Sequence, residues 1–254
     1  MKNLPIRTKL ITAFSLVALV ASTHIVIQNI YAKRLDETKS YAQEIEELKS
    51  LILQGSKVQS DFLTKDLIDD RFYLHGKSEN LFRYESIYEK GRLKFKELAS
   101  HPIAEKGNIP NRIQYLKSSI TSVDRKFKEL VASSLQAGFH DFGTTGEMRN
   151  YAHQLEDDFG ELIPKKDILT LRRHEKDFII RKQEKYRDKF SIHYQELRGH
   201  LENTAGENKM ACLVTLNNYH NAFNRMCQLI LKNGINMKGG LRGEIHDSTE
   251  DILY

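Results

Sequence analysis

The sequence predicts an all-α protein with an N-terminal transmembrane helix, and three observations lead to this prediction. The chain has 254 residues with only 4 prolines and 14 glycines, and no segment alternates polar and apolar residues as strands do. Its long segments are rich in Lys, Glu, Leu, Arg and Gln, and apolar residues return there every three or four positions. The segment Leu10–Ile30 is a single apolar run.

This apolar run has the length that a transmembrane helix needs, about 20 residues. Basic residues precede it, as they also precede the core of a cleavable signal peptide, and Leu10–Ala21 fits such a core. The apolar face nevertheless continues through Ile30 toward the next predicted helix. We therefore expect an uncleaved anchor, with cleavage and release of a helical periplasmic protein as the alternative.

The basic flank also predicts the orientation of the anchor. We divide the chain into a cytoplasmic basic tail over residues 1–9, a transmembrane anchor over 10–32 and an extracytoplasmic helical domain over 33–254. Positive charges favour the cytoplasmic side, so the N-terminus is expected inside. No later segment has 18 consecutive apolar residues, so a single pass is expected.

Beyond the anchor, the 3–4 spacing of apolar residues continues in segments that glycine and proline separate. Gly76 fits the C-terminal cap of the first segment, and Pro164 fits a break. Glycine-rich turns are expected over 138–146 and 233–243. The predicted helices cover residues 31–75, 79–98, 111–137, 147–162, 165–202, 208–232 and 244–254.

A faint internal repeat runs through these helices. Phe72 and Phe178 each follow a cluster of acidic and basic residues, DDRF and EKDF. The pairs with the same offset are Tyr88 with Tyr194 and Arg92 with Arg198, and each half later reaches a glycine-rich turn. Two diverged copies of one helical unit predict two stacked helical bundles.

The charges argue against several classes of function. Lys and Arg total 39 against 34 Asp and Glu, for a net charge of +5, and the signs are interleaved along the helices. Such a pattern is typical of a solvated helical surface and not of a nucleic-acid interface, although a mildly basic surface favours anionic ligands. We expect no nucleic-acid partner.

Catalytic and metal-binding patterns are also missing from the sequence. Cys212 and Cys227 fall on one predicted helix, about 22 Å apart at 1.5 Å per residue, which is too far for a disulfide. No Cys/His ligand spacing, nucleophile motif or phosphate-binding loop is present. We therefore expect neither an enzyme nor a metal or cofactor. The cysteines are expected to pack as small apolar residues, with an intermolecular disulfide as the alternative.

The most unusual segment is LRRHEKDFIIR, Leu171–Arg181, which places charges beside and within the apolar stripe of a helix. A helical wheel puts Glu175 at the centre of the apolar face, Arg172 at its edge and Arg173 on the opposite side. One reading is structural: Arg172 or Lys176 neutralises Glu175, or neutralises the carboxylates of Asp66 and Asp69. The other is a carboxylate clamp, because arginine binds carboxylates through two hydrogen bonds. The candidate ligand-binding residues are Arg71, Arg172, Arg173 and Lys176.

This segment, the basic start with its anchor, and GLRGEIH at 240–246 together resemble the helical bimodular sensory domain of bacterial methyl-accepting chemotaxis receptors and sensor kinases. The resemblance implies two stacked four-helix bundles that share long helices, located in the periplasm and anchored in the inner membrane. It implies small organic anions as ligands, bound inside the bundles, and a signal passed to a cytoplasmic region.

In that family a long last helix follows the GLRGEI-like turn and leads to a second membrane span. Here the sequence ends at Tyr254, so we expect the domain to be incomplete at its C-terminus, with a homodimer or another partner completing the bundle. The alternative function is that of a membrane-anchored structural or adaptor protein that acts through protein contacts.

Overall fold

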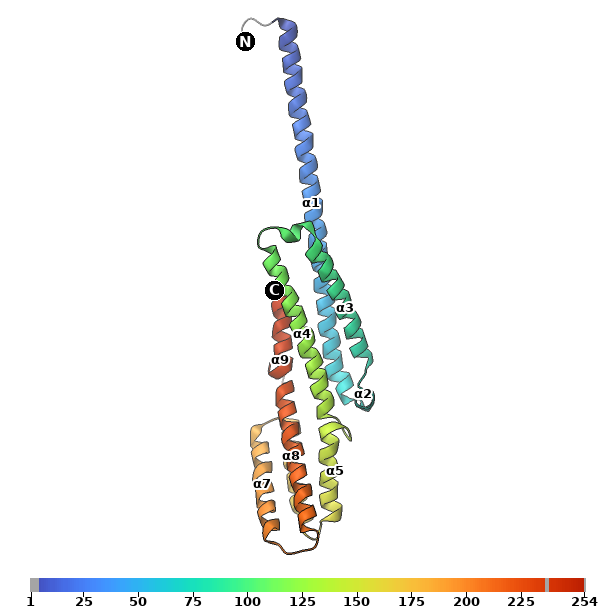
Figure 1. Ribbon diagram of the computed structural model, residues 1–254, viewed down its shortest axis with the longest axis vertical. Helices are drawn as coiled ribbons and strands as arrows, with labels where there is room; N and C mark the ends of the chain where they lie inside the picture. The colour runs from blue at the N-terminus through green and yellow to red at the C-terminus, as the bar shows by residue number, and fades with distance from the viewer. Residues whose placement is uncertain (1–4, 236–237, 254) are drawn as a thin grey trace. The chain divides into compact units, whose positions relative to one another are not determined.

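A computed structural model describes residues 5–235 and 238–253, and within these ranges it contains helices and no strands, which confirms the all-α prediction (Figure 1). A 3₁₀ turn, Asp66–Ile68, follows α1, and another, Pro102–Glu105, follows α3. The α-helices are α1 (Ile6–Lys65), α2 (Asp70–His75), α3 (Glu79–Ser100), α4 (Ile109–Ala137), α5 (Gly143–Asp158), α6 (Lys165–Arg181), α7 (Glu184–Asn203), α8 (Lys209–Asn233) and α9 (Gly240–Leu253).

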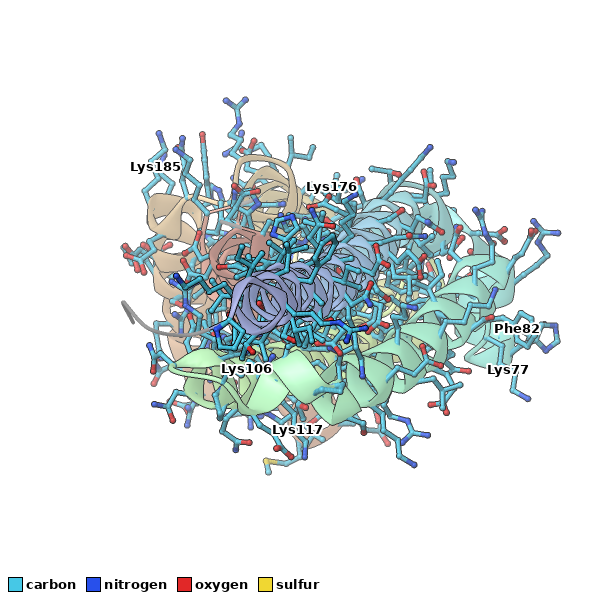
Figure 2. All side chains as sticks on the ribbon, turned by 90° about the horizontal axis from the view of Figure 1, so that it is seen from above. Lys77, Phe82, Lys106, Lys117, Lys176 and Lys185 are labelled. Carbon is cyan, nitrogen blue, oxygen red and sulfur yellow. The ribbon has the colours of Figure 1, made fainter. Side chains whose placement is uncertain are left out.

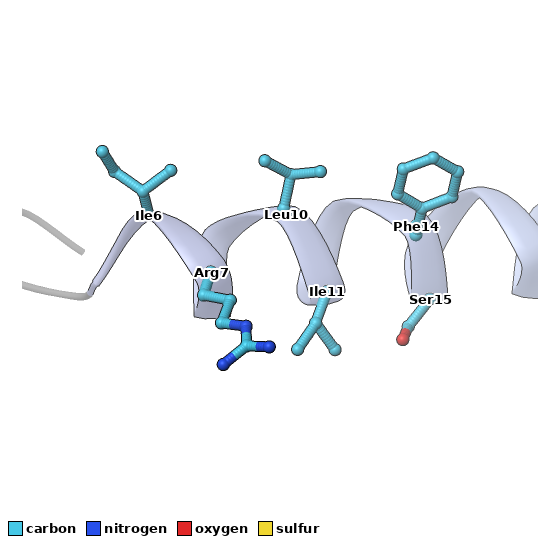
Figure 3. Close-up of a pocket in the computed structure, with 6 residues that line it drawn as sticks. All are labelled: Ile6, Arg7, Leu10, Ile11, Phe14 and Ser15. Carbon is cyan, nitrogen blue, oxygen red and sulfur yellow. The ribbon is translucent and has the colours of Figure 1, made fainter.

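The described chain has one helix long and apolar enough to cross a membrane, and the apolar stretch lies at the N-terminal end of α1. A signal sequence has the same properties. Figure 3 shows Leu10 and Phe14 on one side of this helix and Ile11 on the other, and more than half of each side chain is exposed. Apolar residues on both sides suit a lipid environment better than the surface of a water-soluble helix.

The chain divides into two compact units. One contains the described chain up to Leu51 together with Lys90–Gln114, and the other contains Ile52–Glu89 and the described chain from Tyr115 onward. In the first unit Tyr41 packs against His101, with ring centroids 5.0 Å apart, and Lys94 pairs with Glu47 at 2.7 Å. These contacts join α1 to the end of α3 and the turn that follows it.

The second unit contains a hydrophobic cluster, called the α5–α8 core below, to which these four helices contribute. Each helix buries residues three or four positions apart, as Met148, Ala152 and Leu155 do on α5. Phe178 of α6 and Phe190 of α7 meet on Phe223 of α8, with centroids 5.8 and 4.0 Å from it. The fully or nearly fully buried members from α6, α7 and α8 include Ile168, Leu171, Phe178, Phe190, Tyr194, Leu201, Cys212, Leu216, Tyr219, Phe223 and Cys227.

A second cluster of the same unit, called the α9 core below, gathers helices from both ends of the chain. Phe62 of α1 contacts Phe72 of α2 and Phe127 of α4, with perpendicular rings 5.1 and 5.7 Å apart. Leu241 and Ile245 of α9 pack into the same cluster. The C-terminal helix is therefore part of a core that α1 begins.

The internal repeat has a counterpart in the geometry. Phe72 and Phe178 each accept a backbone hydrogen bond of 2.7 Å, from Gly76 and Lys182, and both donors adopt left-handed backbone angles that end a helix. Tyr84 and Phe190 lie twelve residues after Phe72 and Phe178. Each packs on a phenylalanine of the helix that precedes a glycine turn, Tyr84 on Phe127 and Phe190 on Phe223, with ring centroids 4.4 and 4.0 Å apart. The two halves thus share helix ends and aromatic packing.

The two glycine turns are also built alike. Gly143 and Gly240 start α5 and α9 with φ of +58° each, and a Cβ on either would lie within 2.9 Å of backbone atoms of the same turn. Only glycine accepts both the angle and the close approach without strain. Both turns therefore require glycine to return the chain into the next helix.

Two of the predicted helices are interrupted in the structure, and the helices expected from residues 147 and 244 begin about four residues earlier, at Gly143 and Gly240. The expected continuous helix over 165–202 breaks at Lys182, where the backbone is left-handed and α7 begins two residues later. The expected first helix ends at Lys65, and a 3₁₀ turn and α2 follow before the Gly76 cap, which is confirmed. Side-chain contacts made by Asp66 explain the second difference, because its carboxylate accepts hydrogen bonds from Ser78 and Asn80 and closes a local turn.

Candidate functional site

Three of the four predicted ligand-binding residues lie on one face of α6. Arg172, Arg173 and Lys176 line a shallow hollow of about 350 Å³ whose apolar ends are Leu169 and Ile180. Figure 2 shows Lys176 at the surface of the molecule. This face gathers positive charge, but most of its side chains are exposed to solvent, where a bound anion gains little from any one contact.

The fourth predicted residue, Arg71, does not line this hollow. Its guanidinium binds the carboxylate of Asp69, with Nη2 and Oδ2 2.6 Å apart, and its side chain is 85% exposed. Asp69 also accepts a hydrogen bond from the backbone of Arg71 and thereby caps α2. In this structure Arg71 is engaged at a helix start.

Arg172 has an ion-pair partner that the sequence did not indicate. Its Nη1 lies 2.6 Å from Oε1 of Glu156 on α5, and both side chains are largely buried, at 20% and 12% exposure. The predicted partners make other contacts: Asp66 binds Ser78 and Asn80, and Asp69 binds Arg71. The ion pair joins α5 to α6 beside the α5–α8 core.

Glu175 points into the α5–α8 core, as the helical wheel predicted, and is 6% exposed. Its carboxylate accepts a hydrogen bond from the phenol of Tyr219 on α8. Burial raises the pKa of Glu175, and the hydrogen bond from Tyr219 and the charge of Arg172 partly oppose that rise. Burial, and the nearby carboxylate, also raise the pKa of Tyr219 well above its usual value. The Tyr219 hydroxyl is therefore engaged by Glu175, and the Arg172 guanidinium beside it pairs with Glu156.

A second polar site, which we call the Arg242 cavity, lies beside the α9 core. Its volume is about 60 Å³, room for a few water molecules or a carboxylate group, because one water needs about 10–15 Å³. Side chains of α1, α4 and α9 form its wall. The lining residues are Ser56, Gln59, Ser60, Leu63, Phe127, Leu130, Arg242, Ile245, His246 and Thr249.

Arg242 is the unusual group of this cavity. Its Nε is buried and has no hydrogen-bond partner, and no carboxylate in the described residues pairs with the guanidinium. Burial lowers the pKa of Arg242. Arg242 as a whole is partly exposed, but its Nε–H is removed from solvent, and a desolvated N–H of a cation favours an anionic acceptor.

Lys182 is a second cation that has no carboxylate partner among the described residues. Burial lowers the pKa of Lys182, and the charge of Arg242 lowers it further. The Lys182 ammonium donates a hydrogen bond of 3.2 Å to the carbonyl of Ile235, in the turn that leads to α9.

Neither Arg242 nor Lys182 was among the site residues predicted from the sequence. Arg242 was visible as the arginine of GLRGEIH, between two glycines of a turn, and only its burial beside a cavity distinguishes it from an exposed arginine. Lys182 was assigned to a helix interior. No pattern in the sequence indicated that it ends α6.

Within residues 5–235 and 238–253, no group of three His, Cys, Asp or Glu side chains is arranged to hold a metal ion. Cys212 and Cys227 are buried and free, as the spacing on one helix required. Burial raises their pKa values to about 11 and about 12, so both are neutral thiols that fill the core.

Comparisons with known proteins found no match to a family model, to a curated protein or to a solved structure.

Proposed function

We propose that this chain is the extracytoplasmic sensory part of a chemoreceptor-like membrane protein, and that it binds a small organic anion. The proposal joins three supports: the apolar start of α1, the resemblance of LRRHEKDFIIR and GLRGEIH to helical bimodular sensory domains, and the Arg242 cavity. The anchor occupies residues 10–32, with the N-terminus in the cytoplasm and the helical domain in the periplasm.

The single observation that carries the ligand proposal is the unpaired, buried Nε of Arg242. A carboxylate placed in the cavity accepts two parallel hydrogen bonds from a guanidinium and neutralises its charge. Gln59, buried at 6% exposure, and the hydroxyl groups of Ser56 and Thr249 add polar wall around it. The size of the cavity favours a carboxylate of a few heavy atoms.

The same proposal gives the two cores a place in a bimodular domain. In such a domain the α9 core belongs to one helical bundle and the α5–α8 core belongs to another. The two bundles are stacked and share long helices. A homodimer, or a partner chain, completes the bundle that contains α9. Ligand binding shifts the long helices by a small step and so biases a two-state bundle, which passes a signal across the membrane.

A thermal-shift screen of the full chain in detergent tests the ligand proposal. Sodium acetate, succinate and sulfate are compared with sodium chloride at equal ionic strength. An anion that binds only the folded protein, at 100 times its Kd, adds about 2.7 kcal/mol of stability. For a protein of this size that raises Tm by about 5–11 °C.

Two variants assign the site. Arg242→Gln is expected to remove the shift, whereas Arg173→Gln, which alters an exposed arginine of α6, is expected to keep it. If the shift survives Arg242→Gln and is lost with Arg173→Gln or Lys176→Gln, the predicted clamp on α6 is the binding site and the Arg242 cavity is not. If no anion raises Tm, the sensory proposal fails.

A membrane-anchored adaptor is the second candidate, and the outer face of α6 favours it. Leu169 and Ile180 are 49% and 77% exposed, and Arg173 and Lys176 lie between them at 3–4 spacing. Exposed apolar residues at this spacing suit packing against another helix. If the chain is an adaptor, the double variant Leu169→Ser with Ile180→Ser is expected to abolish recovery of a defined partner from membranes. No anion is then expected to change the Tm of the unmodified chain.

A further inference from the structure

The side of α6 that faces away from the α5–α8 core carries a regular stripe of exposed side chains, called the outer stripe below. The opposite side of the helix is buried, through Ile168, Leu171, Glu175 and Phe178. The members of the outer stripe follow one another at intervals of four, three and four residues, which is the spacing of a seam between two packed helices. They are Leu169, Arg173, Lys176 and Ile180.

The two ends of the outer stripe are aliphatic. Leu169 and Ile180 are both exposed, and they lie about 16 Å apart along the helix at 1.5 Å per residue. Both line the hollow of about 350 Å³ on this face of α6. Exposed aliphatic residues at both ends of one hollow are a surface that another apolar surface can cover.

The middle of the outer stripe is positively charged. In the part of the chain that the structure describes, no carboxylate forms an ion pair with Arg173 or Lys176. The nearest acidic residue along the helix is Asp177, and its carboxylate binds Arg181, with Nε and Oδ1 3.0 Å apart. The hollow therefore presents two cations without a counter-charge between two aliphatic ends.

This order of residues specifies the surface that would cover it. A helix with the same spacing can place aliphatic side chains against Leu169 and Ile180, and carboxylates against the two cations between them. A second copy of the same stripe would instead bring cations against cations, which opposes pairing of α6 with α6 between two copies of the chain. Charge complementarity thus favours an acidic partner.

We propose that the outer stripe of α6 docks an acidic amphipathic helix of a partner protein. The partner helix carries an aliphatic residue, two acidic residues and a second aliphatic residue at intervals of four, three and four. The docking surface is separate from the Arg242 cavity and requires no anion there. It also gives the adaptor candidate a partner of defined chemistry.

Two synthetic peptides test the complementarity on the full chain in non-ionic detergent. Each is a fluorescein-labelled helix of about 18 residues, or five turns, rich in alanine. One carries leucine, glutamate, glutamate and leucine at the stated intervals, and in the other lysine replaces both glutamates. By fluorescence anisotropy we expect the acidic peptide to bind about tenfold more tightly than the lysine peptide, because two attractions become two repulsions. The difference is expected to shrink at high salt, because these charges are exposed.

Two double variants assign the surface. Arg173→Glu with Lys176→Glu is expected to reverse the preference, so that the lysine peptide binds more tightly, a result that loss of folding cannot produce. Lys185→Glu with Lys189→Glu is the matched control. It reverses two exposed cations of α7 that lie 5.0 and 5.8 Å from the ring of Tyr186, and it is expected to keep the preference for the acidic peptide (Figure 2 shows Lys185).

Three results would overturn the docking proposal. The first is equal binding of the two peptides, or no binding of either, by the unmodified chain. The second is a preference that survives in the α6 variant and disappears in the α7 control. The third is a dimer, detected by sedimentation velocity, that Leu169→Ser with Ile180→Ser dissociates, because a second copy of the chain then covers the stripe.

The docking surface and the anion site fail separately. The shift of Tm by an anion depends on Arg242, whereas the peptide preference depends on Arg173 and Lys176. If no anion raises Tm but the peptide preference reverses as expected, the sensory proposal fails and the docking surface stands. If an anion raises Tm and the peptides bind equally, the docking surface fails and the anion site stands.

Discussion

The hydrogen bond between Tyr219 and Glu175 leads to the sharpest prediction about stability. Tyr219→Phe removes the hydroxyl that donates to a carboxylate with 6% exposure and leaves the ring, which packs on Phe190 at 5.3 Å, in place. A hydrogen bond to a charged group contributes about 1.5–3 kcal/mol. At about 2–4 °C per kcal/mol for a chain of this size, Tm is expected to fall by about 3–12 °C at pH 7.5.

The loss is also expected to depend on pH, with a definite sign. Because burial raises the pKa of Glu175, the folded state binds this proton more tightly than the unfolded chain does. The corresponding stability is fully present below the pKa of the unfolded chain and is lost as pH rises through the higher folded pKa. Tyr219→Phe removes a contact that favours the charged form, so its defect is largest at neutral pH and shrinks on acidification.

Thermal unfolding followed by circular dichroism, at pH 7.5 and at mildly acidic pH, measures both effects. Tyr186→Phe is the matched control, because Tyr186 is a partly buried tyrosine of the same core whose ring contacts are with cations and whose hydroxyl is not needed for them. Equal Tm values for the two variants at pH 7.5, or a Tyr219→Phe defect that does not change with pH, would refute the reasoning.

Three further predictions concern the turns, the core and the thiols. Gly143→Ala is expected to lower Tm by several degrees, because the new Cβ would lie 2.7 Å from a backbone carbonyl oxygen and the residue has φ of +58°. Gly199 lies within α7 with open space around it, so Gly199→Ala is expected to raise the free energy of unfolding by about 1 kcal/mol. Phe178→Ala should lower the free energy of unfolding, measured with denaturant, by about 3–5 kcal/mol. Phe82→Ala should lower it little, because that residue is 73% exposed and lies at the surface in Figure 2, and similar losses for the two variants would contradict the assigned core. Cys212 and Cys227, whose pKa values burial raises to about 11 and about 12, should resist iodoacetamide at pH 8 in the folded chain and react after denaturation. Fast labelling of the folded chain would contradict their burial.

Helix ends show where prediction from sequence succeeds and where it fails. The cap at Gly76 was predictable because glycine carries its own conformational preference, and the residue adopts φ of +65°. The end of α6 was missed because lysine carries no such preference. At Lys182 the left-handed backbone is accompanied by a long-range contact to Ile235, which lies 53 residues away in sequence.

The candidate sites show the same division. The periodicity of α6 placed Glu175 inward correctly, because side-chain direction on a helix follows from local geometry. The ion pair of Arg172 with Glu156 was missed, because it depends on which helix packs beside α6. Arg242 was missed for the same reason.

The sequence by itself determined the helical class, the apolar N-terminal helix and most helix positions, because periodicity, helix propensity and glycine or proline signals act within a few residues. Only the tertiary structure decided which charges are paired, which are buried and which line a cavity. Those properties depend on the helices that meet, and α9 joins the core of α1 and α4 across more than a hundred residues of sequence. The buried, unpartnered Nε of Arg242, on which the proposed function depends, is therefore a property of the fold and not of any motif.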